Sequence, residues 1–434
     1  MIAALVGYGY FASDDYRYAL EPAWNLVVHG TSSPASGIRS VVFARIVAVG
    51  MQVAQWLGAE DPAWLVRGAY ILLGLLSLTA IPGIHRLTCD RLGEPAACAA
   101  SWLLACEALM PRIATRALIE VAAIPPLVWG LVFTLRAIDR RSVRAGVAAG
   151  LLLGMAGMLR FQTGIIAVCA VAYVLYARQI RVAFAMAGAG LAALLTQGLI
   201  DLETHGRFLA SLRGYVAFNA ERSSSFGEAP WFTYLVLLVL VTIPPLTLWL
   251  VRPIWDAARA HALVSISLMV FVVLHSFVPH KEERFLFSAF PLAFVLIGAA
   301  LAHVRRSVRT AFWLLNGLAL AVATLSDGQH SIIDPLRDAR TERIVLIGGF
   351  EAPAIYARGI PIDRFLTPED MRLMPLGSRL ITYADRAPME LPDTLRCGPP
   401  QLYRGDFVDR ALLLINPKGN RRRSAKVAID CVPR

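Results

Sequence analysis

The first residues of this chain that are suited to chemistry are three carboxylates near its start. Asp14 and Asp15 are adjacent, and Glu21 follows a few residues later. A carboxylate oriented by neighbouring acids is a suitable general base for taking a proton from a hydroxyl group. The alternative is the solvated start of a loop, and the spacing alone does not decide between the two. The three residues are therefore candidate catalytic acids.

A second segment carries five consecutive ionisable side chains, at His280-Lys281-Glu282-Glu283-Arg284. A tight polar turn, which is the simpler explanation, needs no such density of charge. Histidine, lysine and arginine bind phosphate through charge-assisted hydrogen bonds, and adjacent glutamates can hold these side chains in place. We therefore favour a site for the phosphate of an anionic lipid.

Three weaker signals accompany these segments. Arg160 is followed by Gln162 at a predicted helix–helix turn, where a snorkelling arginine is the simpler explanation. Arg116 and Glu120 are four residues apart, so an ion pair at the start of a helix is as good an explanation as a site. Asn219 precedes an aromatic segment whose rings can equally form an interfacial belt.

The composition indicates that membrane helices position these residues. Of the 434 residues, 57% are hydrophobic and 17% are charged, and the mean hydropathy is +0.57. Soluble domains contain about 25% charged residues. The net charge of +11 has the sign that would attract nucleic acid, but the arginines lie in short clusters between apolar runs, as they do in the cytoplasmic loops of membrane proteins. We therefore predict a membrane protein with no nucleic-acid partner.

Apolar runs that are long enough, or nearly so, to cross a bilayer occupy the first three quarters of the chain. Besides a short first span at 1–12, the runs are 64–84, 94–109, 117–138, 144–158, 161–177, 182–200, 231–250, 262–278, 285–303 and 310–325. This pattern predicts an all-α polytopic protein with about eleven transmembrane helices.

Basic clusters assign the two sides of the membrane, since cytoplasmic loops are enriched in lysine and arginine. The clusters that we place in the cytoplasm are His85–Arg91, Arg140–Arg144, Arg178–Arg181, Arg252–His261 and Arg305–Arg309. Strict alternation of the spans then puts the three acids, the charged run from His280 and the turn at Arg160 on the external side.

The stretch 37–56 is apolar, but it is interrupted by Arg39 and Arg45. An arginine near the middle of a bilayer costs about 2.5–3.5 kcal/mol. We therefore predict a helix that lies in the membrane interface instead of a further span. Residues 13–63 then form one external loop that carries the candidate acids.

The chain changes character after the last predicted span. We predict a transmembrane domain over 1–325 and a small external mixed α/β domain over 326–434. Short β-like runs in the second domain are Ile344–Ile347, Leu412–Ile415 and Val427–Ile429. Two cysteines in this domain, Cys397 and Cys431, are expected to form a disulfide if the domain is external.

The other four cysteines lie in or beside apolar runs, where a buried free thiol is the ordinary interpretation. They are Cys89, Cys98, Cys106 and Cys169. No spacing of cysteine and histidine along the chain is typical of a zinc site, so we predict no metal.

Taken together, these segments resemble glycosyltransferase family 22, which includes the eukaryotic N-glycan and GPI-anchor mannosyltransferases. His280–Phe285 reproduces the HKEERF signature of that family without change. Asp14-Asp15, with Glu21-Pro22 downstream, resembles its acidic pair and Glu-Pro, although the second acid is commonly glutamate in the family. Looser matches follow in the right order, at Ile38-Arg39-Ser40, Thr115-Arg116 with Glu120, and Asn219 with Pro230-Trp231.

The resemblance implies a GT-C fold and inverting transfer of a mannosyl residue from a polyprenyl-phosphate-mannose donor to a lipid-linked or cell-envelope glycan. No cofactor and no metal are expected, because the lipid-linked sugar is the co-substrate. Asp14 is then the expected general base, with Asp15 and Glu21 orienting it or the acceptor. The expected donor phosphate ligands are His280, Lys281, Arg284 and Arg160, and the supporting residues are Glu282, Glu283, Arg116, Glu120 and Asn219.

The arginine- and alanine-rich composition and the short loops suggest a bacterial source, so that the expected location is the inner membrane with a periplasmic site. Three alternatives remain open: a GT-C enzyme that transfers a different polyprenyl-phosphate sugar, a lipid or glycan transporter, and a non-catalytic homologue. A transporter needs ionisable groups or broken helices near the bilayer midplane and often has internal repeats. The polar residues here gather at one surface instead, and no repeat is visible in the sequence.

Overall fold

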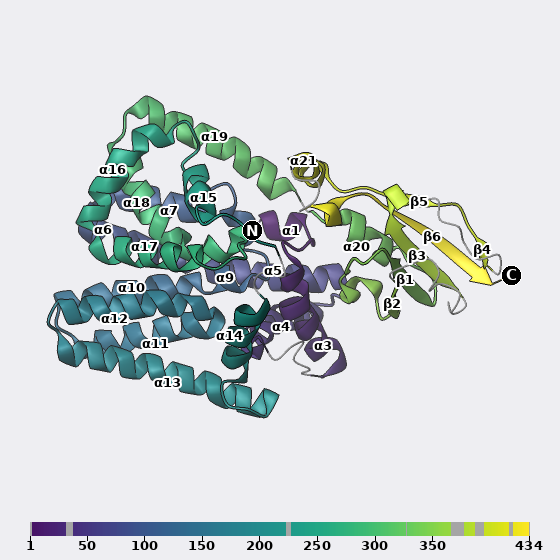
Figure 1. Ribbon diagram of the computed structural model, residues 1–434, viewed down its shortest axis with the longest axis horizontal. Coiled ribbons are helices and arrows are strands. Elements are labelled where there is room, and N and C mark those ends of the chain that lie inside the picture. The colour runs from purple at the N-terminus through teal and green to yellow at the C-terminus, as the bar shows by residue number, and fades with distance from the viewer. Residues whose placement is uncertain are drawn as a thin grey trace. The chain divides into compact units, whose positions relative to one another are not determined.

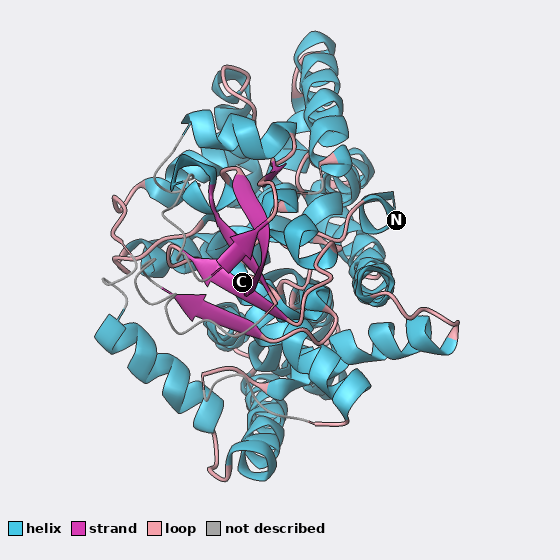
Figure 2. Cartoon of the chain, turned by 90° about the vertical axis from the view of Figure 1, so that its right-hand side faces the viewer, coloured by secondary structure: helices cyan, strands magenta, loops and turns pink. Residues whose placement is uncertain are grey.

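The computed structural model describes residues 2–31, 38–222, 227–326, 328–365, 377–386, 395–415 and 420–433. The chain is mostly helical, and its strands gather in one small sheet near the C-terminus (Figures 1 and 2). Contacts divide it into two compact units. The helical unit comprises Pro34–Ile46 and Leu72–Ala321, and the mixed unit comprises Ile2–Ser33, Val47–Ile71 and Val322–Arg434.

Successive hairpins build most of the helical unit. Its helices are α6 (Ala80–Leu92), α7 (Glu94–Cys106), α8 (Met110–Ile113), α9 (Ile119–Ala122), α10 (Ile124–Asp139), α11 (Val143–Leu159), α12 (Gly164–Tyr176), α13 (Ile180–His205), α14 (Ala210–Arg222), α15 (Thr233–Val241), α16 (Thr247–Ala260), α17 (Ala262–Ser276), α18 (Phe290–His303) and α19 (Arg306–Leu325). Two 3₁₀ helices, η2 (Phe161–Thr163) and η4 (Glu283–Ala289), precede α12 and α18. Two further helices, α4 (Val41–Trp56) and α5 (Pro62–Leu78), are shared between the units, as is the last turn of α19.

Small residues let the backbones of neighbouring helices approach closely. A Cβ atom at Gly150 of α11 would lie 2.0 Å from the carbonyl oxygen of Met186 on α13. A Cβ atom at Gly298 of α18 would lie 2.6 Å from the backbone nitrogen of Ala100 on α7. Glycine is therefore required at both contacts, which is the usual way in which membrane helices pack.

Five helical segments among the described residues are long and apolar enough to cross a membrane: Pro62–Leu92, Ile119–Asp139, Ile180–His205, Glu283–His303 and Arg306–Arg337. A sixth is added if α16 and α17, which are bent by 112° at their junction, form one broken span. Shorter apolar helices are Val41–Trp56, Val143–Leu159 and Phe161–Tyr176. The prediction of a multi-pass membrane protein is confirmed, and the number of eleven spans stays a prediction.

Three details of the predicted topology are wrong. In place of a first span at 1–12, the described chain has α1 (Ile2–Val6), which is too short to cross a bilayer. The predicted span 231–250 is broken between α15 and α16 at Pro244-Pro245, because proline has no N–H to donate within a helix. Two predicted loops are helical instead: Arg252–His261 is mostly within α16, and His85–Arg91 lies wholly within α6.

The first of these two helices, α16, is amphipathic. Arg252, Asp256 and Arg259 are spaced along α16 as residues of one helical face. The buried apolar residues of this helix, Leu250 and Ala257, lie on the opposite face. A basic cluster was therefore mistaken for a loop because its charges are the polar face of a helix. The predicted helix within 37–56 is confirmed as α4, and its position in the membrane interface stays a prediction.

The mixed unit contains a six-stranded sheet of order β2-β1-β3-β6-β4, with β5 also paired to β6. The strands are β1 (Arg343–Ile347), β2 (Ile362–Phe365), β3 (Ser378–Tyr383), β4 (Leu395–Cys397), β5 (Gln401–Tyr403) and β6 (Lys426–Pro433). β1 is parallel to β2 and β3, whereas β6 is antiparallel to β3, β4 and β5. The helices α20 (His330–Arg337) and α21 (Phe407–Ile415) accompany this sheet.

The small C-terminal sheet and two of its predicted strands are confirmed. Ile344–Ile347 lies in β1 and Val427–Ile429 in β6, but Leu412–Ile415 is the end of helix α21. A short apolar run alone does not distinguish a strand from a helix. Cys397 and Cys431, which face each other in β4 and β6, form the predicted disulfide.

The N-terminal acidic segment belongs to the same compact unit as this sheet. It folds into α2 (Ser13–Asp15), a π-helical turn (Tyr16–Leu20) and α3 (Glu21–His29). The backbone N–H of Ala354 donates to Glu21 at 2.8 Å, and the Tyr16 hydroxyl donates to Glu351 at 3.3 Å. The mixed unit thus includes N-terminal residues as well as the tail, and the predicted domain boundary at 325/326 stays a prediction.

We predict that the disulfide stabilises the sheet and reports the compartment of the tail. Replacing Cys397 and Cys431 by serine should lower the free energy of unfolding of the mixed unit by about 2–4 kcal/mol. In cells, both thiols should resist a maleimide reagent until they are reduced, if the tail is external. Limited proteolysis, together with labelling before and after reduction, measures both effects. Cys169→Ser is the control, and labelling of Cys397 without reduction would contradict the prediction.

Candidate active site

Three buried charges from distant parts of the chain meet in the helical unit. Glu120 lies in α9, Arg160 directly follows α11, and Arg284 lies in η4. None of the three is more than 5% exposed. The Glu120 carboxylate lies 3.1 Å from Arg160 Nη1 and 3.9 Å from Arg284 Nη1. One buried carboxylate therefore compensates two buried guanidinium groups, as buried charges require.

The HKEERF segment adds further charged side chains to this cluster. Arg284 donates to Glu282 from Nε at 2.5 Å and from Nη2 at 3.2 Å. His280 Nε2 lies 3.0 Å from the same carboxylate, and its Nδ1 lies 3.1 Å from the Gly227 carbonyl. Burial alone would raise the pKa of Glu282, but the Arg284 charge, followed by hydrogen bonds from Arg284 and His280, lowers it to about 2. Glu282 therefore stays ionised and fixes the side chains of Arg284 and His280.

Lys281 is held differently from its neighbours. Its ammonium group donates to the Ala229 carbonyl at 3.0 Å and to the Val278 carbonyl at 2.7 Å. Within the described part of the chain it has no carboxylate partner. Backbone carbonyls orient this ammonium group and leave its charge for an anion. Glu283, the remaining member of the run, is exposed.

Arg160 has hydrogen-bonding capacity that is not used. All three of its guanidinium nitrogens lack a hydrogen-bond partner among the described residues, although Nη1 is in ion-pair range of Glu120. The Phe285 ring lies 5.1 Å from the guanidinium of Arg160 and 5.2 Å from that of Arg284. A planar guanidinium whose donors are unused and whose position is fixed by an aromatic ring is a suitable ligand for a phosphate.

Two buried side chains that the sequence did not single out lie close to this cluster. Tyr234 is 1% exposed and His275 is 7% exposed, and their rings pack edge to face at 6.3 Å. Arg160 interacts electrostatically with both. The only sequence signal for His275 is one polar residue near the end of the apolar helix α17, which by itself more often indicates a satisfied structural histidine.

Tyr215 of α14 links three of the weaker motifs. Its ring lies 5.4 Å from the Arg39 guanidinium and 5.7 Å from the Phe161 ring, and its hydroxyl accepts from the Gln162 amide. Asn219, on the same helix, donates to the Tyr215 carbonyl at 2.7 Å. The side chain of Asn219 is therefore bonded within its own helix. Tyr215 is a residue of α14 that no sequence motif singled out.

A buried carboxylate anchors the start of α14. Asp201 is fully buried and accepts from the backbone and hydroxyl of Ser211 at 2.9 and 2.6 Å. Gln197 donates to Asp201 at 2.7 Å and accepts from Ser40 at 2.9 Å. The Ser40 and Arg39 of the Ile-Arg-Ser motif are thereby tied to α13 and α14 by hydrogen bonds and ring contacts.

Arg116 and Glu120 are both buried, but the ion pairs of Glu120 described above reach beyond its own helix. Arg116 is 2% exposed and donates to the Thr115 hydroxyl at 3.1 Å. Glu120 pairs with Arg160 and Arg284, which come from other segments. The four-residue spacing therefore does not account for the role of Glu120, which is to join α9 to the HKEERF segment and the α11–α12 turn.

The three candidate acids lie in the mixed unit and differ in environment. The Asp15 carboxylate is 2% exposed and accepts from the backbone of Phe11 at 2.7 Å and of Ala12 at 3.0 Å. Asp14 is half-buried. Burial raises the pKa of Glu21, although the Ala354 N–H and nearby arginines oppose the shift. Asp15 thus shapes the segment, and Asp14 is the more accessible of the adjacent pair.

A family model described as the Alg9-like mannosyltransferase family matches residues 26–327, which is more than half of the chain. The chain belongs to that family. The matched region includes Glu120, Arg160 and the whole HKEERF segment, and it begins after the three candidate acids. The resemblance drawn from the sequence motifs is confirmed.

Curated relatives of this family member carry GPI mannosyltransferase names. GPI mannosyltransferase 3 of Yarrowia lipolytica is 30% identical over 218 residues, which are 45% of this chain and 40% of that protein. GPI alpha-1,2-mannosyltransferase 3 of Danio rerio is 24% identical over 226 residues, 51% of this chain and 39% of that protein. The chain thus matches about two fifths of the length of these relatives.

Solved structures confirm the GT-C fold. ArnT from Cupriavidus metallidurans, solved with bound undecaprenyl phosphate, superposes with a TM-score of 0.65 at 14% identity, covering 98% of this chain and 96% of ArnT. The Archaeoglobus fulgidus oligosaccharyltransferase superposes with a TM-score of 0.53 at 12% identity, covering 83% of this chain and 61% of that protein.

We predict that Glu120 and Arg160 stabilise the helical unit as a coupled pair. Removing one partner of a buried ion pair leaves an unpaired charge, so Glu120→Gln and Arg160→Met should each cost about 3–5 kcal/mol, and the double variant less than their sum. Thermal unfolding in detergent measures the cycle. The control cycle is Arg91→Met with Asp139→Asn, an exposed pair 2.5 Å apart that should contribute about 0–1 kcal/mol. Additive effects in the buried pair would refute the coupling.

We also predict a pH-dependent contribution of Glu282. Its pKa in the folded protein is lowered from 4.5 to about 2, so its stabilising effect is present above the unfolded value and is lost as the pH falls through that interval. The unfolding temperature of Glu282→Gln should therefore lie below that of the wild type at neutral pH and approach it in strong acid. Glu283→Gln, at an exposed position, is the control. A difference between wild type and Glu282→Gln that is constant with pH would contradict the assignment.

Proposed function

We propose that this protein transfers a mannosyl residue from a polyprenyl-phosphate-mannose donor to a lipid-linked or cell-envelope glycan. The proposal rests on one observation: Arg160 and Lys281, in or beside the HKEERF segment, are two cations that can still bind an anion. Arg160 offers hydrogen-bond donors without acceptors, and Lys281 offers an ammonium group without a carboxylate partner, both among the described residues. Membership of the Alg9-like mannosyltransferase family supports the sugar, and the names of the curated relatives agree with it.

A polyprenyl phosphate is the donor class that suits these cations. The leaving group of such a donor is a lipid phosphate, whose developing negative charge preorganised cations stabilise. Arg160, Arg284, Lys281 and His280 supply that charge in this proposal, and Glu120 and Glu282 hold the two arginines in place. ArnT from Cupriavidus metallidurans, which shares the fold, was solved with undecaprenyl phosphate bound, and a lipid of the same chemical class is proposed here.

The proposed reaction is a single inverting displacement. The acceptor hydroxyl oxygen attacks the anomeric carbon of the sugar, the bond from that carbon to the phosphate oxygen breaks, and the hydroxyl proton passes to a general base. We assign the base to Asp14, because Asp15 already accepts two backbone hydrogen bonds and is buried. Glu21 and Asp15 orient the acidic segment. The reaction uses the lipid-linked sugar as co-substrate and needs neither cofactor nor metal.

The proposed location is a bacterial inner membrane, with the reaction on the periplasmic side. The basic clusters of the sequence lie on the opposite side in the predicted topology. A disulfide in the unit that contains the candidate acids supports an oxidising compartment.

The decisive measurement is transfer of labelled mannose by purified protein from synthetic polyprenyl-phosphate-mannose to a lipid extract of the source cells. We expect transfer from the lipid donor and none from GDP-mannose. Asp14→Asn should lower the rate about 10²–10⁴-fold, as loss of a general base does. Arg160→Met should also lower the rate, because the departing phosphate loses stabilising charge.

Asp139→Asn is the matched control, since it removes an exposed carboxylate of α10, and it should leave transfer unchanged. Full activity of an Asp14→Asn/Asp15→Asn double variant that is properly inserted would exclude the proposed base. Transfer of a different sugar from its polyprenyl phosphate, with no transfer of mannose, would instead identify a GT-C enzyme of other donor specificity. Binding of the lipid donor without any transfer would indicate a transporter or a non-catalytic homologue.

A further inference from the structure

The α6–α7 hairpin of the helical unit gathers four side chains that carry metal-binding atoms. His85 and Cys89 are four residues apart on α6, and Glu94 and Cys98 are four residues apart on α7, so each pair shares one helical face. Gly93, with φ +83°, is the only residue between the two helices. This tight connection brings the His85/Cys89 face of α6 against the Glu94/Cys98 face of α7. The spacing of these residues along the chain had not predicted that the two faces meet.

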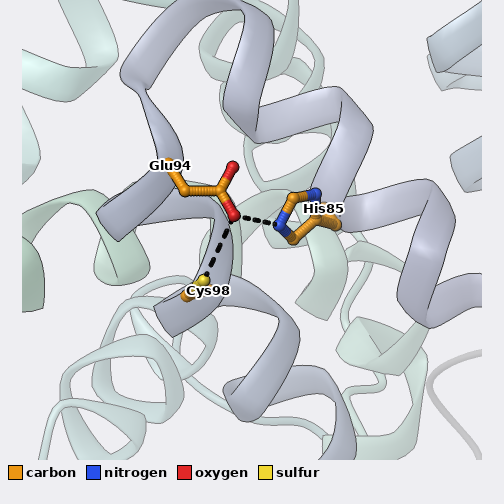
Figure 3. A group of neighbouring side chains, drawn as sticks. All are labelled: His85, Glu94 and Cys98. Carbon is orange, nitrogen blue, oxygen red and sulfur yellow. Dashed lines mark hydrogen bonds and ion pairs between the residues drawn. The ribbon is translucent and has the colours of Figure 1, made fainter.

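Figure 3 draws three of these side chains, with the Glu94 carboxylate between His85 and Cys98. Its Oε1 atom is 3.1 Å from His85 Nε2 and 3.6 Å from Cys98 Sγ, and the ligand atoms of these three residues all lie within 4.8 Å of one another. Cys89 Sγ reaches the other carboxylate oxygen at 3.2 Å. The group therefore offers two sulfur atoms, one nitrogen and one carboxylate.

These distances are close to those of a tetrahedral metal site. With metal–ligand bonds of about 2.0–2.3 Å, the ligand atoms of a tetrahedral zinc ion lie roughly 3.3–3.8 Å apart. The distances from Glu94 Oε1 to His85 and Cys98 approach this spacing, and the ligand atoms of the three residues are at most 4.8 Å apart. Cys89 Sγ lies 3.2 Å from the other oxygen of the same carboxylate, which makes it the fourth candidate ligand. Both cysteines are free thiols, and none of the four residues is buried inside the protein.

We propose that His85, Cys89, Glu94 and Cys98 bind one zinc-class divalent metal ion. Two thiolates and an imidazole favour zinc and similar soft ions over magnesium or calcium, which prefer oxygen ligands. Four protein ligands would close the coordination shell, as in a structural site. The role of the ion would be to fix the α6–α7 hairpin, whose second helix packs against α18 at Gly298. It takes no part in the proposed glycosyl transfer.

The test is a cobalt titration of the full-length protein in detergent. The protein should carry an affinity tag without histidine and have its thiols reduced. We expect one equivalent of Co²⁺ to bind with a thiolate-to-cobalt charge-transfer band and to be displaced by Zn²⁺. Metal analysis should likewise find about one zinc per chain after zinc is added and the excess is removed.

Variants locate the site. Cys89→Ser/Cys98→Ser should abolish the charge-transfer band, and His85→Ala should weaken binding by at least about 10–100-fold, since loss of a mere outer partner already has an effect of that size. The matched control is Cys106→Ser/Cys169→Ser, which removes the two free thiols outside the group and should bind cobalt as the wild type does.

Three results would overturn the proposal. The first is wild-type protein with reduced thiols that gives no charge-transfer band. The second is a band that survives in Cys89→Ser/Cys98→Ser or disappears in the control variant. The third is a Cys89–Cys98 disulfide, found by mass spectrometry in protein freshly isolated under thiol-blocking conditions, which would assign the two thiols a redox role instead.

Discussion

The arrangement of the helical unit depends on the compensation of two buried guanidinium groups, those of Arg160 and Arg284, by the carboxylates of Glu120 and Glu282. An isolated charge in a low-dielectric interior is too costly to persist, so Arg160 is buried beside Glu120, and Arg284 is buried beside Glu282 with Glu120 at longer range. Satisfying this constraint brings together α9, the end of α11 and the 3₁₀ segment before α18, which are far apart in sequence. The Ser288 hydroxyl, which donates to the Glu120 carbonyl at 2.8 Å, closes the same junction from the backbone side.

The charged side chains around this junction differ in how much of their hydrogen-bonding capacity is used within the protein. Glu282 neutralises Arg284 through two hydrogen bonds and also holds His280. Arg160 has only one carboxylate within ion-pair range, and Lys281 has only carbonyl partners, among the residues that the structure describes. A cluster that is electrostatically stable yet keeps donors available can receive an anion without rearranging its own ion pairs. This preorganisation is what stabilisation of a departing phosphate requires.

The acidic segment is organised by a different means. Asp15 caps its own turn by accepting two backbone N–H groups, and the Glu21 carboxylate accepts the N–H of Ala354 from the unit that contains the sheet. Asp61 adds ion pairs to Arg358 at 2.7 Å and to Arg337 at 3.6 Å. The C-terminal tail is therefore part of what shapes the N-terminal acids, and the disulfide between Cys397 and Cys431 fastens the far strands of its sheet.

The membrane character, the family, the C-terminal sheet and the disulfide could all be predicted from the amino-acid sequence. These follow from local signals: long apolar runs, an intact HKEERF, short β-like runs and two isolated cysteines. The folded chain was needed to find the partners of Glu120, the unused donors of Arg160 and the backbone hydrogen bonds of Asp15. The same holds for the grouping of His85, Cys89, Glu94 and Cys98. Each of these depends on which segments meet in space, and spacing along a chain reports a shared helical face but not the face that lies opposite it.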